Sequence, residues 1–155
     1  MKISNEGIDL IKKYEGCKLY AYRDSVGVAT IGYGHTKDVR MGQAITQKQA
    51  DDFLRSDLVS VEKTLNLLGI NFKQCQFDAL CSWTFNLGSG NLMHSTMLKK
   101  MTAGASDEEV TDQLIKWHKA GGKPLLGLKK RRVAEANMFL GYVRYKVKDK
   151  EIIKV

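Results

Sequence analysis

A change of hydrophobic periodicity at Thr46 constrains the fold of this 155-residue chain more than any other feature. From Thr46 to Gly69 the apolar residues recur at helical spacing and form one stripe: Ala50, Phe53, Leu54, Leu58, Val61 and Leu65. Thr46 and Gln49 have the spacing of a capping box, and Gly69 ends the pattern. The sequence therefore predicts one long helix here, with different kinds of structure before and after it.

The part before this helix mixes a short helix with strand-like segments. Residues 4–15 carry apolar side chains at helical spacing, namely Ile8, Ile11 and Tyr14. Gly16 is a natural helix stop directly after them. Residues 19–24 and 28–34 are short, aromatic and β-branched, and they flank a turn sequence. We therefore expect a small antiparallel sheet.

The part after the long helix is predicted to be helical. The periodic segments cover residues 73–88, 95–101, 106–122 and 126–141. The charged tail from residue 142 alternates with apolar residues and indicates an extension or a short strand. The fold class is α+β, with a small sheet-containing lobe and a larger helical lobe joined by a long helix. A cleft between two such lobes is a usual place for a ligand.

The charge balance favours an anionic partner without identifying it. The chain has 25 Lys and Arg against 17 Asp and Glu, a net charge of +8. Nucleic acid, a membrane surface and a bacterial wall all fit that balance. The three cysteines do not have the spacing of a disulfide framework or a zinc site, so we expect reduced, buried thiols. No segment has the apolar length of a signal peptide or a membrane span.

Two acidic residues and a threonine stand out near the start of the chain. Glu15 closes the first predicted helix, where the helix dipole disfavours a negative charge. Asp24 and Thr30 follow in the strand-like stretch. Glycosidic cleavage commonly uses two carboxyl groups, one protonated and one ionised. The alternative is that Glu15 is ordinary surface charge and that Asp24 opens a turn with Gly27.

Three motifs resemble the phage-type lysozymes, the endolysins of tailed phages. The segment "YEGCKLYAYRDSVGVATIGYGHT" is similar to the catalytic segment of that family. The segments "ALCSWTFNLGSGNLMHSTMLKKM" and "WHKAGGKPLLGLKKRR" resemble its lambda-like branch, in the family's order. The resemblance implies one lysozyme-like domain over residues 1–155 with a catalytic cleft between its lobes. The β-containing lobe would cover about 15–45, the connecting helix 46–68, and the helical lobe 1–14 and 70–145.

The resemblance also assigns roles to individual residues. Glu15 corresponds to the general acid, Asp24 to the second carboxylate and Thr30 to the hydroxyl that positions water. The implied reaction is hydrolysis of the β-1,4 bond between N-acetylmuramic acid and N-acetylglucosamine, by inversion, with no metal and no cofactor. Five residues correspond to positions that line the substrate cleft: His35, Thr36, Phe85, Thr96 and Gln113. Two of them have a structural alternative, because His35 suits a hydrogen-bonded, fold-fixing histidine and Phe85 suits the core.

The implied partner is the glycan strand of peptidoglycan, bound by a monomer. Neither nucleic acid nor stable membrane insertion is expected, and the basic run Lys129–Arg132 is interpreted as a solvated helix face. The family's biology implies accumulation in the host cytoplasm, release through a separate holin-type pore and action on periplasmic peptidoglycan. Two alternatives stay open: a wall-binding module without activity and a basic nucleic-acid-binding domain. The sequence does not determine which cation pairs with Glu15.

Overall fold

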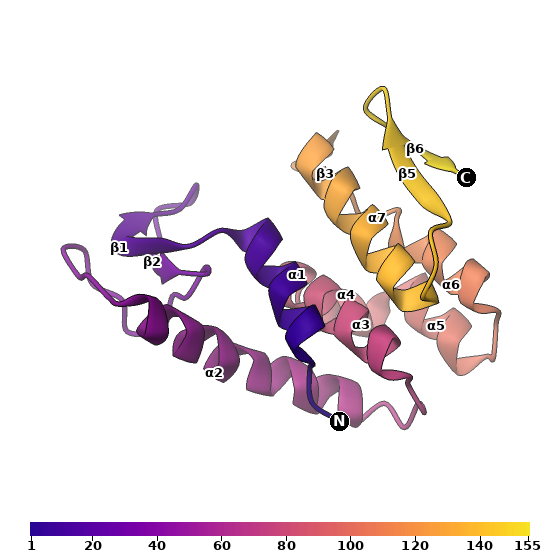
Figure 1. Cartoon of the computed structure of the whole chain (residues 1–155), viewed down its shortest axis with the longest axis horizontal. Helices are drawn as coiled ribbons and strands as arrows, with labels where there is room; N and C mark the ends of the chain where they lie inside the picture. The colour runs from indigo at the N-terminus through magenta and orange to yellow at the C-terminus, as the bar shows by residue number, and fades with distance from the viewer. The chain divides into compact units, whose positions relative to one another are not determined.

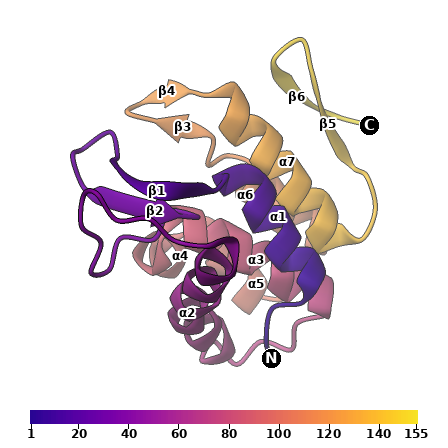
Figure 2. The ribbon, with the colours of Figure 1, turned by 60° about the vertical axis from the view of Figure 1, so that its left-hand side comes forward.

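The computed structural model describes all 155 residues, and the chain forms two compact units. One unit is Ile11–Ser60, and the other is Met1–Leu10 together with Val61–Val155. Figure 1 shows the helices and strands along the chain, and Figure 2 shows them from a second direction. Helices make up most of the chain, with three small two-stranded antiparallel sheets, so the predicted α+β class is confirmed.

The unit Ile11–Ser60 contains the predicted small sheet. It holds the end of α1 (Asn5–Glu15), then β1 (Lys18–Arg23), β2 (Ala29–Gly32) and the first part of α2 (Gln47–Asn66). The strands β1 and β2 pair antiparallel, with Tyr22 opposite Thr30. Its buried centre consists of apolar side chains from α1, β2, the loop before α2, and α2 itself. They are Ile11, Ile31, Ile45, Ala50, Leu54 and Leu58.

Helix α2 begins as the sequence predicts. The side chain of Thr46 accepts a hydrogen bond from the backbone nitrogen of Gln49 at 3.1 Å, and the backbone nitrogen of Thr46 donates to the Gln49 side chain at 2.8 Å. Both halves of the capping box are therefore present. The helix ends at Asn66, three residues before Gly69, because Leu68 closes a tighter turn by donating to the carbonyl of Leu65.

The other unit is built around two long helices, α3 and α7. Its further elements are α3 (Gln74–Leu87), α4 (Ser89–His94), α5 (Thr96–Thr102), α6 (Asp107–Leu114), β3 (Lys119–Ala120), β4 (Lys123–Pro124), α7 (Leu126–Leu140), β5 (Tyr145–Lys148) and β6 (Glu151–Lys154). Helix α3 packs against α7, as both views show (Figures 1 and 2). The core of this unit contains these fully buried apolar side chains: Phe77, Leu80, Trp83, Leu92, Met97, Leu114 and Tyr145.

One predicted boundary in this unit is wrong, and the predicted tail is more regular than expected. The helix expected over residues 106–122 ends at Leu114, although Ser106 caps its start by accepting from the nitrogen of Glu109. The chain then forms the short hairpin β3–β4, whose turn uses Gly121 and Gly122, both at positive φ. The tail expected as an extension or short strand is the hairpin β5–β6, visible in Figure 2. Helix α4 was not predicted at all.

The interpretation of Lys129–Arg132 as a solvated helix face is also wrong. Only Lys130 is exposed, whereas Lys129, Arg131 and Arg132 are buried. The reason is Glu135, one turn further along α7 and fully buried, which pairs with Arg131 and Arg132 at 3.2 Å each. Ser82 on α3 donates to the same carboxylate. Buried charges are retained only when they are paired in this way.

The cysteines are less buried than expected. Cys81 on α3 is buried, and burial raises the pKa of its thiol. Cys17 and Cys75 are only half-buried, so the expectation of three buried thiols is wrong for these two. Among the helices, none combines the length and the apolar content that crossing a bilayer requires.

Candidate active site

Glu15 is the last residue of α1 and is half-buried. Gly16 ends the helix at φ +68°, and its nitrogen donates to the carbonyl of Lys12 at 3.0 Å. The carboxylate lies against Gly34, because a Cβ built on that glycine would be 3.4 Å from Oε1 of Glu15. The helix end and the segment after β2 therefore meet at this carboxyl group.

The segment after β2 is a tight loop that glycine makes possible. Ile31 and His35 exchange both backbone hydrogen bonds, each at 2.9 Å. Gly32 and Gly34 between them have φ values of +65° and +76°, a region that side-chain-bearing residues rarely adopt. The G-x-G pattern is thus explained by backbone conformation and by the close approach of Glu15.

Asp24 is oriented by the turn that it opens. One carboxylate oxygen, Oδ1, accepts hydrogen bonds from the nitrogens of Val26 at 3.0 Å and Val28 at 2.8 Å. The backbone nitrogen of Asp24 donates to the carbonyl of Val28 at 2.9 Å, and Gly27 supplies the positive φ that the turn needs. The second oxygen, Oδ2, accepts no hydrogen bond from the protein. This carboxylate is therefore fixed through one oxygen and available through the other.

Thr30 is 3% exposed and lies on β2. Its hydroxyl donates to the carbonyl of Val28 at 2.8 Å, so the oxygen keeps its lone pairs for a further donor. The peptide groups of Val28 thus connect the two residues, since its nitrogen binds Asp24 and its carbonyl oxygen binds Thr30. The structure brings Asp24 and Thr30 together at one turn.

The ring of His35 is engaged by α2. Its Nδ1 lies 3.0 and 2.8 Å from the two carboxylate oxygens of Asp57. The ring also stacks on Phe53, with centroids 4.3 Å apart. This agrees with the structural alternative for His35, and its neighbour Thr36 is exposed. Asp57 was not predicted as a partner of His35, although its i, i+4 spacing from Phe53 places both residues on one helix face.

A second group of contacts supports the end of α1. Lys12, one turn before Glu15, pairs with Asp51 of α2 at 2.9 Å, and its ammonium lies 5.5 Å from the ring centre of Tyr33. Gln47 donates to the hydroxyl of Tyr33 and to the carboxylate of Asp51. The hydrogen bond from Lys12, and then that from Gln47, lower the pKa of Asp51. These contacts hold Glu15 in place through the helix that carries it.

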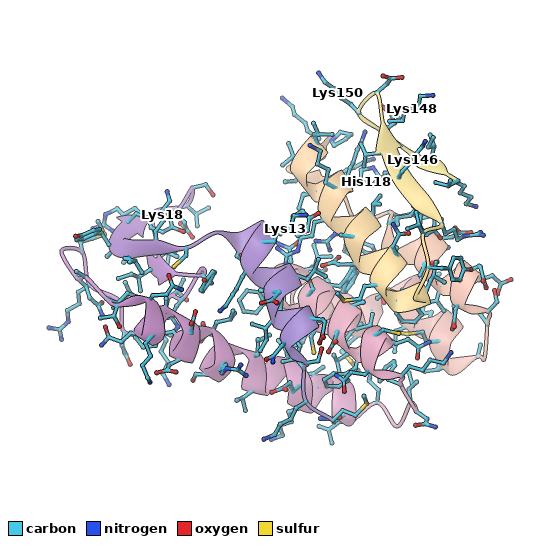
Figure 3. All side chains as sticks on the ribbon, viewed as in Figure 1. Lys13, Lys18, His118, Lys146, Lys148 and Lys150 are labelled. Atoms are coloured by element: carbon cyan, nitrogen blue, oxygen red, sulfur yellow. The ribbon has the colours of Figure 1, made fainter.

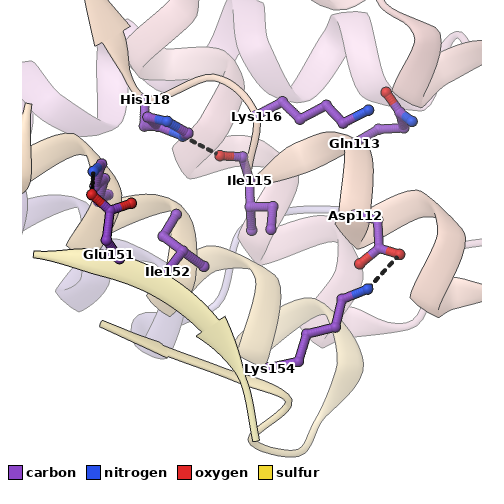
Figure 4. Close-up of a pocket in the computed structure, with 9 residues that line it drawn as sticks. Asp112, Gln113, Ile115, Lys116, His118, Glu151, Ile152 and Lys154 are labelled. Carbon is purple, nitrogen blue, oxygen red and sulfur yellow. Dashed lines mark hydrogen bonds and ion pairs between the residues drawn. The ribbon is translucent and has the colours of Figure 1, made fainter. Parts of the chain in front are cut away.

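The other three predicted substrate contacts lie in the larger unit, on three different helices. Phe85 is half-buried near the end of α3, and Thr96 is exposed at the start of α5. Gln113 on α6 lines a pocket of about 520 Å³ together with Lys116 and His118 (Figure 4). His118 points its Nδ1 at the carbonyl of Ile115, 2.7 Å away, so this nitrogen carries the proton. The assignment of Phe85, Thr96 and Gln113 to substrate binding stays a prediction.

No group of three or more His, Cys, Asp or Glu residues is arranged to hold a metal ion. The site in Ile11–Ser60 consists of a half-buried acid at a helix end, a carboxylate with one available oxygen and a buried hydroxyl beside it. Carboxyl groups with different surroundings are the usual means of general acid and base catalysis.

Comparison with known proteins gives this arrangement a family. A family model described as phage lysozyme matches residues 12–135. The endolysin of Acyrthosiphon pisum secondary endosymbiont phage 1 is 44% identical over 90% of this chain and 98% of its own length. The muramidase domain of SpmX from Asticaccaulis excentricus is 35% identical with a TM-score of 0.84, covering 90% of this chain and 97% of that one. A mutant of P22 lysozyme is 37% identical with a TM-score of 0.83, and the match covers 90% of this chain and 99% of that lysozyme. This chain belongs to the phage lysozyme family.

Proposed function

We propose that this protein is an endolysin of the muramidase type, which hydrolyses the β-1,4 bond between N-acetylmuramic acid and N-acetylglucosamine in peptidoglycan. Glu15 protonates the leaving oxygen, Asp24 is the second carboxylate, and Thr30 positions the attacking water. The observation that carries the proposal is the joint attachment of Asp24 and Thr30 to Val28. It puts a carboxylate oxygen and a hydroxyl oxygen, both able to accept, on the same turn.

A water molecule between these two acceptors has a defined orientation. Water has two protons, and it can donate one to Oδ2 of Asp24 and the other to the lone pair of Thr30. The free lone pair of the water then points away from both residues. Asp24 takes up the first proton as the water attacks the anomeric carbon. This is general base catalysis on the face of the sugar opposite the leaving group, which inverts the configuration.

Glu15 is suited to the other half of the reaction. It is the last residue of α1, and the C-terminus of a helix disfavours a negative charge. Gly34 leaves the carboxyl group room but borders it on one side. A carboxyl group that donates a proton to the glycosidic oxygen raises the reaction rate on the order of 10²–10⁴-fold.

The remaining expectations follow from the same proposal. The substrate is the glycan strand of peptidoglycan, which His35, Thr36, Phe85, Thr96 and Gln113 help to bind. The protein acts as a monomer without a cofactor, and a separately encoded holin-type pore releases it from the host cytoplasm to the periplasmic wall. The endolysin and muramidase relatives support the substrate.

Turbidity clearing of permeabilised Gram-negative cells tests the roles of the acids. Glu15→Gln and Asp24→Asn should each lower the clearing rate by at least about 10²-fold. Each replaces a carboxyl group by an amide of similar shape that cannot exchange the catalytic proton. Asp9→Asn is the matched control, since Asp9 is an exposed acid on the same helix as Glu15. Full clearing by Asp24→Asn would contradict its assignment. Binding of the wild type to walls without any clearing would identify the wall-binding module.

A conservative pair of variants tests Thr30. Thr30→Ser keeps an oxygen next to Val28 and should stay within a few-fold of wild type, whereas Thr30→Val should fall by about tenfold or more. Equal activity of the two variants would exclude a role for the hydroxyl. NMR of the first-formed sugar tests the stereochemistry, since inversion gives the α-anomer and a β-anomer would indicate retention. Mass spectrometry separates hydrolysis from the formation of an anhydro sugar.

A further inference from the structure

The C-terminal segment Tyr142–Val155 lies outside the residues that the family model matches. It is nevertheless a fixed part of the fold. Tyr145 is fully buried, and its hydroxyl donates to Asp112 of α6 at 2.7 Å. The side chain of Asn137 on α7 binds the backbone nitrogen of Tyr145 at 3.1 Å and its carbonyl at 3.0 Å. The hairpin β5–β6 is thus held on α6 and α7 in one position (Figure 2).

The two faces of this hairpin differ in character. Directly opposed residues of an antiparallel pair share a face. Tyr145 opposite Lys154 and Val147 opposite Ile152 form the face that contains the buried tyrosine. On the other face Lys146 lies opposite Ile153 and Lys148 opposite Glu151. Figure 3 shows Lys146 and Lys148 following one another along β5, with Lys150 at the turn, and all three are exposed.

The turn of the hairpin has a lysine at a position whose positive φ favours glycine. Asp149 and Lys150 have φ values of +51° and +66°, the signs of a type I′ turn. Asp is tolerated in that conformation, but Lys is not favoured there. Lys129 supports the strained residue by donating to its carbonyl at 2.8 Å. The tip of the hairpin therefore carries a lysine with a strained backbone and an exposed side chain.

Apolar side chains are exposed at the base of the same hairpin. Tyr142 is 49% exposed, Val143 67% and Val155 71%. The nitrogen of Val155 donates to the carbonyl of Arg144 at 2.7 Å, so Val155 lies at the same end of the hairpin as Val143. The segment as a whole has five basic and two acidic residues. Exposed aliphatic and aromatic groups beside lysines are typical of surfaces that lie in the headgroup layer of a membrane.

We propose that this hairpin surface, made of Tyr142, Val143, Lys146, Lys148, Lys150 and Val155, attaches the protein to a bilayer face with anionic phospholipid headgroups. The lysines pair with lipid phosphates, and the three apolar side chains enter the interfacial layer. A nucleic acid or another soluble polyanion offers the phosphates but no apolar layer, so the exposed valines favour the bilayer. The attachment is peripheral and does not depend on the proposed hydrolysis.

Vesicle co-sedimentation of the full chain tests this attachment. Wild type should bind vesicles of phosphatidylethanolamine and phosphatidylglycerol, and should bind pure phosphatidylcholine at least about tenfold more weakly. The triple variant Lys146→Glu, Lys148→Glu, Lys150→Glu should lose binding by about tenfold or more. The matched control is Lys2→Glu, Lys63→Glu, Lys99→Glu, which changes three exposed lysines elsewhere and gives the same net charge. It should bind within about threefold of wild type.

A second variant tests whether the exposed valines contribute to membrane binding. Val143→Ser with Val155→Ser should reduce binding mainly at high salt, where the charges are screened. Equal binding by both lysine triples would overturn the proposal, since net charge alone would then explain it. Tighter binding to a DNA duplex than to anionic vesicles would overturn it in favour of nucleic acid. Far-UV circular dichroism and thermal melts that match wild type would show that each variant is folded.

Discussion

Replacing Gly34 by alanine tests whether the contact with this glycine positions Glu15, the proposed catalytic acid. Gly34 has a φ of +76°, and its added Cβ would be 3.4 Å from Oε1 of Glu15. A side-chain-bearing residue in this backbone region costs about 1–2 kcal/mol in the free energy of unfolding. For a chain of this size that corresponds to a fall in Tm of roughly 2–8 °C.

The same change should also affect catalysis. A Cβ at 3.4 Å touches the carboxyl oxygen at the short limit of ordinary van der Waals contact, so any relaxation of the strained alanine toward Glu15 displaces the carboxyl group. Small displacements of a catalytic group lower the rate steeply, and about tenfold in kcat is expected here. The measurement is wall hydrolysis at saturating substrate, well below the Tm of each variant.

Gly42→Ala is the matched control for this prediction. Gly42 has a φ of +90°, and nothing lies within 4 Å of its added Cβ. The two variants should therefore lose similar stability, and only Gly34→Ala should lose kcat. Equal kcat values in two folded variants would refute the reasoning that Gly34 positions Glu15.

Three further predictions concern positions away from this glycine. Asp57→Asn should cost about 1–3 kcal/mol of stability, because the buried ring of His35 loses a charged hydrogen-bond partner; thermal melts check this. Lys150→Gly should raise stability by about 0.5–1 kcal/mol by relieving its positive φ, and should weaken binding to anionic vesicles in the same preparation. Burial raises the pKa of Asp112, but the hydrogen bonds from Tyr145 and Lys154 outweigh it, so the pKa is lowered overall. Its contribution to stability is therefore complete above the unfolded pKa of about 3.9 and is lost as the pH falls through the lower folded value. Asp112→Asn should therefore make the free energy of unfolding depend less on pH, as measured by denaturant titrations at pH 2–5.

Features that depend on neighbouring residues were predictable from the sequence. The capping box at Thr46, the N-cap at Ser106 and the glycine helix ends at Gly16 and Gly141 all involve groups within four positions of one another. Local hydrogen bonds and allowed backbone angles decide such features. The stripe along α2 was predictable for the same reason, because its period alone gives the buried face.

Features that depend on distant residues were not predictable. The burial of Arg131 and Arg132 depends on Glu135 together with Ser82, which is 49 positions before Arg131. The composition of a basic run does not show whether its side chains are exposed to solvent or buried in ion pairs. The partner of His35 is Asp57, 22 positions away, and only the fold brings them together. The end of α6 at Leu114 is a similar case, since the helical period continues while the chain turns into β3–β4.

The two interpretations of Asp24 turn out to be compatible. The sequence left open whether Asp24 opens a turn or takes part in catalysis. In the structure Oδ1 makes the turn by accepting from Val26 and Val28, and this bond fixes the direction of Oδ2. Val28 then passes the same constraint to Thr30 through its carbonyl. A base that directs water must be held rigidly, and a carboxylate that uses one oxygen for the backbone satisfies that need. In the proposed mechanism the turn is therefore part of the catalytic arrangement, and a change at Val28 that moved its peptide would affect both acceptors at once.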